Sequence, residues 1–185
     1  MQKTNISSLQ ASHEEADTRM ILHAVNSPAD MVVVMSRDSN VFLLHLHHYD
    51  LMKCNKLFMM AGTSTKRKYV PIHEICQQLS PVEKANILAF HAITGCDVTS
   101  HPTLISNVKG WCTFKNHAGL LTSLSNVPLT DNAAESAEEF IVKLYKNFDL
   151  NTCEAARHAL FDKVSSLVKF SYEDFHQQAM LSDFT

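Results

Sequence analysis

The chain has 185 residues, a formal net charge of −3 and 45% hydrophobic residues. Such a composition can bury a substantial core, so it excludes a disordered protein and favours one globular domain, with or without a helical appendage. The apolar run Met31–Met35 is far shorter than the roughly 20 residues of a membrane helix, so no membrane partner is expected. The bulk charge gives no argument for nucleic acid, but basic contacts can be local.

The first third of the chain predicts a polar tail, a helix and a strand. Residues 1–11 are polar and unpatterned. Ser12 followed by Glu15 has the spacing of a capping box, so a helix is expected there, and Asn26 marks its end. The short β-branched run Met31–Met35 predicts a buried strand. A strand after a helix favours an α/β layer with a mostly parallel sheet.

The middle of the chain predicts a helix over 41–48, then a hairpin of strands 56–60 and 68–70. A short helix over 71–79 is expected next. Ser80-Pro-Val-Glu83 predicts a second helix, because Ser is a strong N-cap, Pro suits the first helical position and Glu completes a capping box. That helix is expected to end near Thr94, with Gly95 as its stop.

The last part of the chain predicts helices and little else. Residues 98–130 are mixed and rich in Ser, Thr and Asn. Helices are expected at 118–124, at 132–145 with Thr130 or Asp131 as cap, and at 152–168. The expected organisation is therefore a flexible tail at 1–11, an α/β core at 12–128 and a helical C-terminal extension at 129–185.

Four acids stand at the ends of these predicted elements. Glu15 and Asp17 open the first helix, Asp38 follows the strand, and Asp97 follows Gly95. Each has an ordinary interpretation, since acids stabilise the first turn of a helix and Asp is common in turns. Together they suit Mg²⁺ or Mn²⁺, and hydrolysis of a phosphodiester by two ions needs such a cluster of oxygen ligands.

The same residues carry a resemblance to a known family. Glu15-Ala-Asp17 resembles the Glu-Ala-Glu signature of flap endonucleases and their relatives, which belong to the PIN-like nucleases. Ser36-Arg-Asp-Ser-Asn40 resembles their strand-end motif of two acids, and Gly95-Cys-Asp97 resembles their Gly-x-Asp motif. Longer strings are similar to transposon-associated PIN-like proteins of animals: His13-Glu-Glu-Ala-Asp-Thr-Arg-Met20, Pro71-Ile-His-Glu-Ile75 and Phe90-His-Ala-Ile-Thr-Gly-Cys-Asp97.

This resemblance, over roughly residues 12–165, implies a PIN-like three-layer core that lacks its first strand. It implies a divalent-metal-dependent nuclease acting on DNA or RNA, with Glu15, Asp17, Asp38 and Asp97 as catalytic metal ligands. If the chain is active, a structure-specific endonuclease or exonuclease is expected. Asn40 replaces the second strand-end acid and joins the ligand set as a neutral oxygen, so activity is expected to be weakened or lost. The alternative is a non-catalytic module that binds nucleic acid or protein.

The resemblance also implies partners and a location. DNA is favoured over RNA, and nucleic-acid contacts are expected from Lys66, Arg67, Lys68 and Lys109, although a basic run is more often a solvated hairpin tip. The absent first strand would leave the strand at 31–35 with an open edge that invites self-association. Five widely spaced cysteines without a C-x-x-C pair indicate reduced thiols, so an intracellular protein is expected. A nuclear location is expected alongside the nucleic-acid partner that the resemblance implies.

Other chemistry finds little support in the sequence. His45, His47 and His48 with Cys54 match no usual zinc spacing, so packing and surface roles are favoured. His91 precedes the Gly-x-Asp motif and is expected to be a packed residue or an outer neighbour of the metal site.

Overall fold

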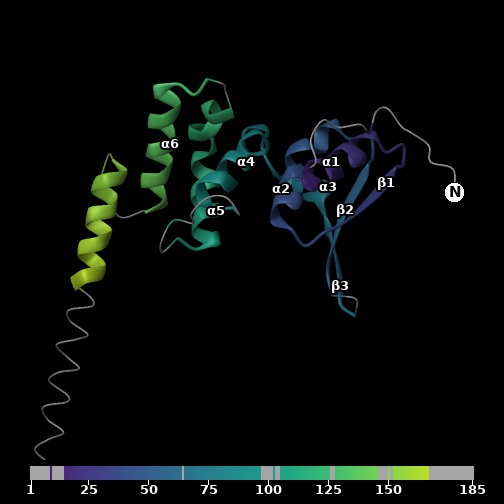
Figure 1. Ribbon diagram of the computed structural model, residues 1–185, viewed down its shortest axis with the longest axis horizontal. Helices are drawn as coiled ribbons and strands as arrows, with labels where there is room; N and C mark the ends of the chain where they lie inside the picture. Colours follow the sequence, from purple (N-terminus) through teal and green to yellow (C-terminus); the bar gives the residue numbers. More distant parts are fainter. Residues whose placement is uncertain are drawn as a thin grey trace, which may run out of the picture.

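The computed structural model of the chain describes residues 9, 15–63, 65–96, 102, 105–125, 128–145, 150 and 152–166. Within them the fold is α/β and largely helical, with a three-stranded sheet near one end and a stack of helices toward the other (Figure 1). The elements in chain order are α1 (Ala16–Asn26), β1 (Met31–Met35), α2 (Ser39–His48), η2 (Tyr49–Leu51), β2 (Lys56–Gly62), β3 (Arg67–Pro71), α3 (Ile72–Gln78), α4 (Pro81–Thr94), α5 (Asn107–His117), η3 (Ala118–Ser125), α6 (Asp131–Leu144) and a last helix at 153–166.

The sheet has the strand order β1-β2-β3 and is mixed. β1 and β2 run parallel, because α2 and η2 return the chain to the starting end of the sheet before β2 begins. β2 and β3 run antiparallel as the predicted hairpin. The expectation of a mostly parallel sheet is therefore wrong: the turn between Gly62 and Arg67 is too short for a parallel crossover, so the third strand has to run antiparallel.

The two faces of the sheet differ sharply in burial. Leu57 and Met59 of β2 are buried, and α3 packs on the strand that carries them. α1 packs on β1 and on α2, so these helices cover the same side (Figure 1). Because side chains alternate between the two faces along a strand, the residues that alternate with Leu57 and Met59 point to the other face. On that open face Met31, Val33, Met35 and Tyr69 are exposed.

The start of α1 differs from the expectation. The helix begins at Ala16, and Glu15 is its N-cap residue with extended backbone and no capping hydrogen bond from its side chain. A capping box between Ser12 and Glu15 would require helical backbone at Glu15, so that part of the prediction is wrong. Asp17 does lie in the first turn, and the helix ends at Asn26 as expected.

The predicted boundaries of α4 are confirmed. Ser80 Oγ accepts the backbone N–H of Glu83 at 3.3 Å, and the Glu83 carboxylate accepts the backbone N–H of Ser80 at 2.7 Å. Gly95 follows the helix with φ of 109°, a backbone conformation that residues other than glycine rarely adopt. The capping box and the glycine stop together fix both ends of this helix.

The second half of the molecule is a helical unit that the sequence predicted only in part. α5 lies inside the segment for which only one helix near 118–124 was expected, and η3 takes that place as a 3₁₀ helix. The polar sequence of α5 conceals its buried side, formed by Gly110, Thr113 and Phe114 at helical spacing. Thr130 is the N-cap of α6, with its Oγ1 accepting from Ala133 N–H at 3.2 Å.

One continuous core joins the two halves. Leu57 of the sheet, Ile87 of α4, Phe114 of α5 and Phe140 of α6 belong to the same buried cluster. α2 connects the units by packing on both α3 and α4. No helix in the described part of the chain has the length and apolar character needed to cross a bilayer.

Candidate functional site at the carboxyl end of β1

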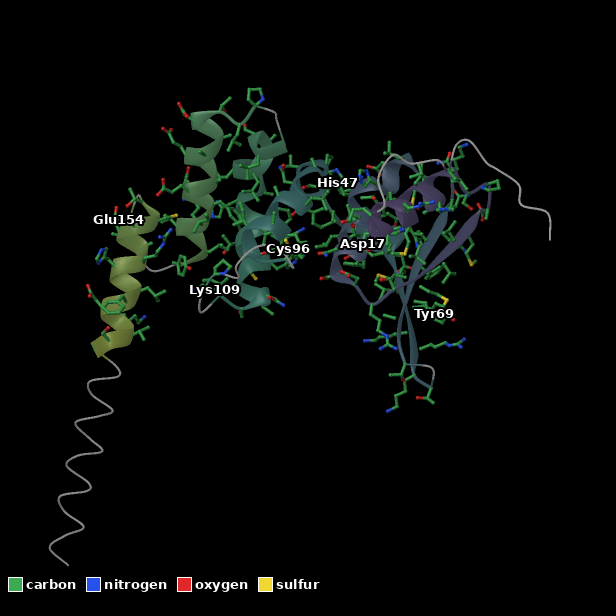
Figure 2. All side chains as sticks on the ribbon, viewed as in Figure 1. Asp17, His47, Tyr69, Cys96, Lys109 and Glu154 are labelled. Carbon is green, nitrogen blue, oxygen red and sulfur yellow. The ribbon has the colours of Figure 1, made fainter. Side chains whose placement is uncertain are left out.

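The described members of the expected ligand set lie at the start of α1 and between β1 and α2. Asp17 is half-buried in the first turn of α1, whereas Glu15 is exposed just before that helix. Figure 2 places Asp17 where the sheet meets the helical unit, with Cys96 beyond the end of α4. Asp97, the fourth expected acid, lies outside the described residues, so convergence of all four acids stays a prediction.

Asp38 is the N-cap of α2. Its Oδ1 accepts the backbone N–H of Asn40 at 2.7 Å, and its own N–H donates to Ser36 Oγ at 3.1 Å. This local network explains why the chain turns from strand to helix within Ser36–Asn40, since Asp is among the strongest N-cap residues. The same bond turns one carboxylate oxygen of Asp38 toward the start of α2.

Asn40 is held by the helical unit. His91 in the last turn of α4 donates from Nε2 to Asn40 Oδ1 at 2.6 Å, and both side chains are half-buried. An amide oxygen can only accept, so the imidazole Nε2 carries the proton. The position where the resemblance expects a second strand-end acid therefore makes a hydrogen bond between α2 and α4. His91, expected as a packed residue or an outer neighbour of the metal site, bonds directly to one of the expected ligand positions.

The described ligands do not fit a complete two-ion site. Oxygen donors such as those of Asp17, Asp38 and Asn40 suit Mg²⁺ chemically. Across the residues that the structure describes, however, no three His, Cys, Asp or Glu side chains lie close enough to share one ion. The Asn40 oxygen already accepts from His91.

The expected nucleic-acid contacts fall into two separate places. Lys66, Arg67 and Lys68 are exposed at the β2–β3 turn and the start of β3. In Figure 2, side-chain nitrogens gather around this hairpin. Lys109 lies in the first turn of α5, far from the hairpin in the same view. These four residues thus do not form a single basic surface.

A pocket opens on the hairpin side of the same strand end. It has a volume of about 430 Å³ and combines the end of β1 with the end of β2 and the start of β3. Its lining residues are Met35, Ser36, Arg37, Met60, Ala61, Gly62, Thr63 and Arg67. Sequence reasoning did not single out Arg37, although it lies inside the strand-end motif beside Asp38. The sequence did offer a signal for Arg37, because it is a cation just beyond the carboxyl end of a predicted strand, where α/β proteins commonly bind ligands.

Three of the cysteines have a raised thiol pKa. All five are free thiols, and burial raises the pKa of the Cys76 thiol to about 11. Burial also raises the pKa of Cys54 and of Cys153. A nucleophilic cysteine needs a lowered pKa, so these three side chains act as packed thiols.

Comparison with known proteins does not assign a family: no family model matches the chain, and neither a curated protein nor a solved structure is significantly similar to it.

Proposed function

We propose that the chain is a module that binds single-stranded nucleic acid, has a nuclease-like layout and cleaves phosphodiesters slightly or not at all. The observation that carries the proposal is the basic hairpin, in which Lys66, Arg67 and Lys68 are exposed. Among the described residues, no ion pair neutralises any of the three. Exposed unpaired cations that track a backbone are the usual electrostatic footprint for phosphates.

The charge distribution supports this proposal despite the acidic total. Between Met31 and Pro71 the sequence has six Lys and Arg residues against two Asp, a local charge of +4 without histidines. The excess acids lie elsewhere in the chain, for example along α6, which contains Asp131, Glu135, Glu138 and Glu139. A local positive field of this kind attracts a polyanion even when the net charge is −3.

The weak or absent cleavage rests on Asn40. A second acid at this position would help to hold a divalent ion, but the amide is neutral and bonded to His91. Loss of one ligand charge weakens the attraction for the ion at close range, where Coulomb energies are largest. The chain is therefore expected to bind nucleic acid, as the resemblance implies, but to cleave it slightly or not at all.

The test measures binding and cleavage on the same substrate. A labelled single strand should bind in EDTA with a dissociation constant of about 10⁻⁶–10⁻⁴ M, weakening as salt rises. A flap substrate and the single strand should stay intact with Mg²⁺ or Mn²⁺. Absence of binding at low salt contradicts the proposal. Robust cleavage that is lost in Asp38→Ala would instead establish a metal-dependent nuclease.

Self-association is a second proposed property, favoured by the position of β1. It is an edge strand of the described sheet, with Met31, Val33 and Met35 exposed. Open apolar edges pair with other chains, and a charged residue on them discourages pairing. Sedimentation should detect concentration-dependent dimers that Val33→Lys weakens and Val108→Lys, on exposed α5 surface, does not. A monomer at all concentrations would contradict this property and leave nucleic-acid binding untouched.

A further inference from the structure

The pocket beside the hairpin is built from three strand ends that meet in a fixed register. Met35 of β1 pairs with Met60 of β2, and Met60 pairs with Tyr69 of β3. Register partners share a face, so these three side chains form one row across the open face of the sheet. Arg67 lies two residues before Tyr69 on the same strand and therefore on the same face, in the next row, opposite Gly62.

Two guanidinium groups approach this pocket from opposite strands. Arg37 follows β1 on one side of β2, and Arg67 begins β3 on the other side. Neighbouring strands lie about 4.8 Å apart, so the two backbones are separated by roughly 10 Å across β2. Side chains as long as arginine can converge over that span on one anion. Guanidinium groups suit phosphate oxygens because their N–H groups form paired hydrogen bonds.

No acid competes for these arginines inside the pocket. Its lining contains no Asp or Glu, and the ion pairs among the described residues involve neither Arg37 nor Arg67. Two like charges that share a pocket without a carboxylate repel each other, so an anion between them is favourable. One carboxylate oxygen of Asp38, the next residue in sequence, accepts the N–H of Asn40 at the start of α2.

The turn that carries Arg67 is preformed. Gly62 has φ of 97°, and a Cβ at this position would lie 2.2 Å from the carbonyl oxygen of Lys66. Thr63 and Lys66 exchange backbone hydrogen bonds of 3.2 Å in both directions. Only glycine allows this close approach, and it fixes where β3 starts. A turn that is already folded loses less conformational entropy on binding a ligand than a turn that must order on contact.

An exposed aromatic side chain lies two residues from Arg67 on the same face of β3. Tyr69 is 52% exposed although it belongs to a sheet, and it flanks Met60 of the pocket floor. Figure 2 shows Tyr69 along the outer part of the hairpin, away from the helical unit. Exposed aromatic rings next to a cationic track are typical of proteins that bind single strands, because an unpaired base stacks on the ring.

We infer that this pocket binds one nucleotide unit of a single-stranded nucleic acid. One backbone phosphate lies between Arg37 and Arg67, and an adjoining base stacks on Tyr69. This inference rests on the proposed function and deepens it, because it places the contact on the open face rather than beside the acids. Stacking on a ring is tolerant of base identity, so the site discriminates strandedness more than sequence.

The test compares paired substitutions on the full chain. Arg37→Gln together with Arg67→Gln should weaken binding of a labelled oligonucleotide about tenfold or more, since each removes charge-assisted hydrogen bonds. The plot of log affinity against log salt should become shallower by about 0.7, the value for one phosphate of a single strand. Arg19→Gln, an exposed arginine on α1 at the covered side, is the matched control and should change little.

Tyr69 tests the base contact separately. Tyr69→Ala should weaken binding at least about fivefold, whereas Tyr69→Phe should restore it, because stacking needs the ring and not the hydroxyl. DNA and RNA strands of one sequence are compared, together with a duplex that should bind less well than either strand. Melting temperatures of all variants should stay near that of the wild type, since these side chains are exposed.

The outcomes separate the inference from the proposed function. If the wild type binds and the double arginine variant binds equally well, the pocket assignment is wrong while nucleic-acid binding stands. If Tyr69→Phe fails as badly as Tyr69→Ala, stacking is not the contact. If the wild type binds neither strand at low salt, the proposed function fails and the inference fails with it.

Discussion

The two faces of the small sheet differ in what they contribute to the protein. The covered face buries Leu57 and Met59 under helices and joins a core that extends to α6. The open face leaves Met31, Met35 and Tyr69 exposed at 53%, 72% and 52%. Burial of apolar area stabilises the fold, so the first face supplies the stability. An exposed apolar face gains nothing from folding alone, and such surfaces are usually binding sites.

The same contrast holds beyond the end of β1, where the adjacent residues Arg37 and Asp38 have different surroundings. Arg37 lines the pocket with Arg67, whereas Asp38 caps α2. The helix side has a closed network in which Asn40 accepts from His91. The pocket side has cations with no acidic partner among the described residues. Exposed cations without an acidic partner remain free to bind an anion, so binding is expected on the open side.

The largest expected effect comes from cutting into the covered face. Leu57→Ala should lower the free energy of unfolding by about 2–5 kcal/mol, because it removes a fully buried side chain and leaves a cavity. Met31→Ala on the open face should change it by less than about 0.5 kcal/mol. Urea denaturation of both variants measures the difference. Equal losses would show that the open face is covered in solution, and the contrast between the faces would fail.

The next effect concerns the turn that shapes the pocket. Gly62→Ala should destabilise the protein by about 1–3 kcal/mol, because the added Cβ meets the Lys66 carbonyl and the positive φ becomes strained. Oligonucleotide binding should fall with it, since the position of Arg67 depends on the turn. Gly119→Ala is the control, because its added Cβ would meet no atom within 4 Å. A Gly62→Ala variant with unchanged melting and binding would contradict the preformed cradle.

A buried histidine on the covered side should make stability depend on pH. His45 is fully buried, its Nδ1–H donates to Val41 O at 2.7 Å, and its Nε2 has no partner among the described residues. Burial lowers the pKa of His45 below its ordinary value, partly offset by the bond to Val41. The folded state therefore binds fewer protons than the unfolded chain. Its stability is fully present above the unfolded pKa of about 6.5 and falls as pH drops below it.

Replacing that histidine should flatten the pH profile. His45→Leu is expected to lose less stability than the wild type between pH 7.5 and pH 5.5, as judged from urea midpoints. Burial and the charges of His47 and His45 also lower the pKa of His48, so part of the dependence stays in the variant. An unaltered slope in His45→Leu would contradict a neutral buried imidazole.

The smallest effect tests the closed network on the helix side. Asn40→Asp restores the charge that the resemblance expects, so Mg²⁺ or Mn²⁺ should raise its melting temperature more than that of the wild type. Each 1 kcal/mol of binding energy corresponds to about 2–4 °C for a chain of this size. Asn132→Asp at the exposed start of α6 is the control. If the metal ions raise the melting temperature of the wild type as much as that of Asn40→Asp, the neutral Asn40 side chain does not limit metal binding.

Much of the fold could be predicted because its signals are local. The run Met31–Met35 is a strand at those residues, although the expectation that it is buried is wrong, because one of its faces is open. The capping box at Ser80 and the glycine stop at Gly95 fix α4. α5 could not be predicted in the same way, since its buried side relies on Gly110 and Thr113, which are not apolar signals. Gly110 is buried there because α5 approaches the Phe90 ring, a tertiary contact.

The candidate site was predictable only in its individual residues. The sequence identified Asp38, Asn40 and His91, but their pairing depends on how α4 packs against α2. The pocket was harder still, because Arg37 and Arg67 meet only through the register of three strands. A parallel pairing shifted by one residue would send Met35 and Met60 to opposite faces, and no local pattern specifies that register.

The most direct test of the central claim is a map of where a single strand touches the protein. Backbone amide shifts of the full chain are followed by NMR while an unlabelled oligonucleotide is added in EDTA. The account predicts shifts at Met35–Arg37 and Met60–Tyr69, with little change over Ser39–His48 and Pro81–Thr94. Shifts concentrated on α1, α2 and the end of α4, with the hairpin silent, would contradict it, because nucleic acid would then lie against the acids.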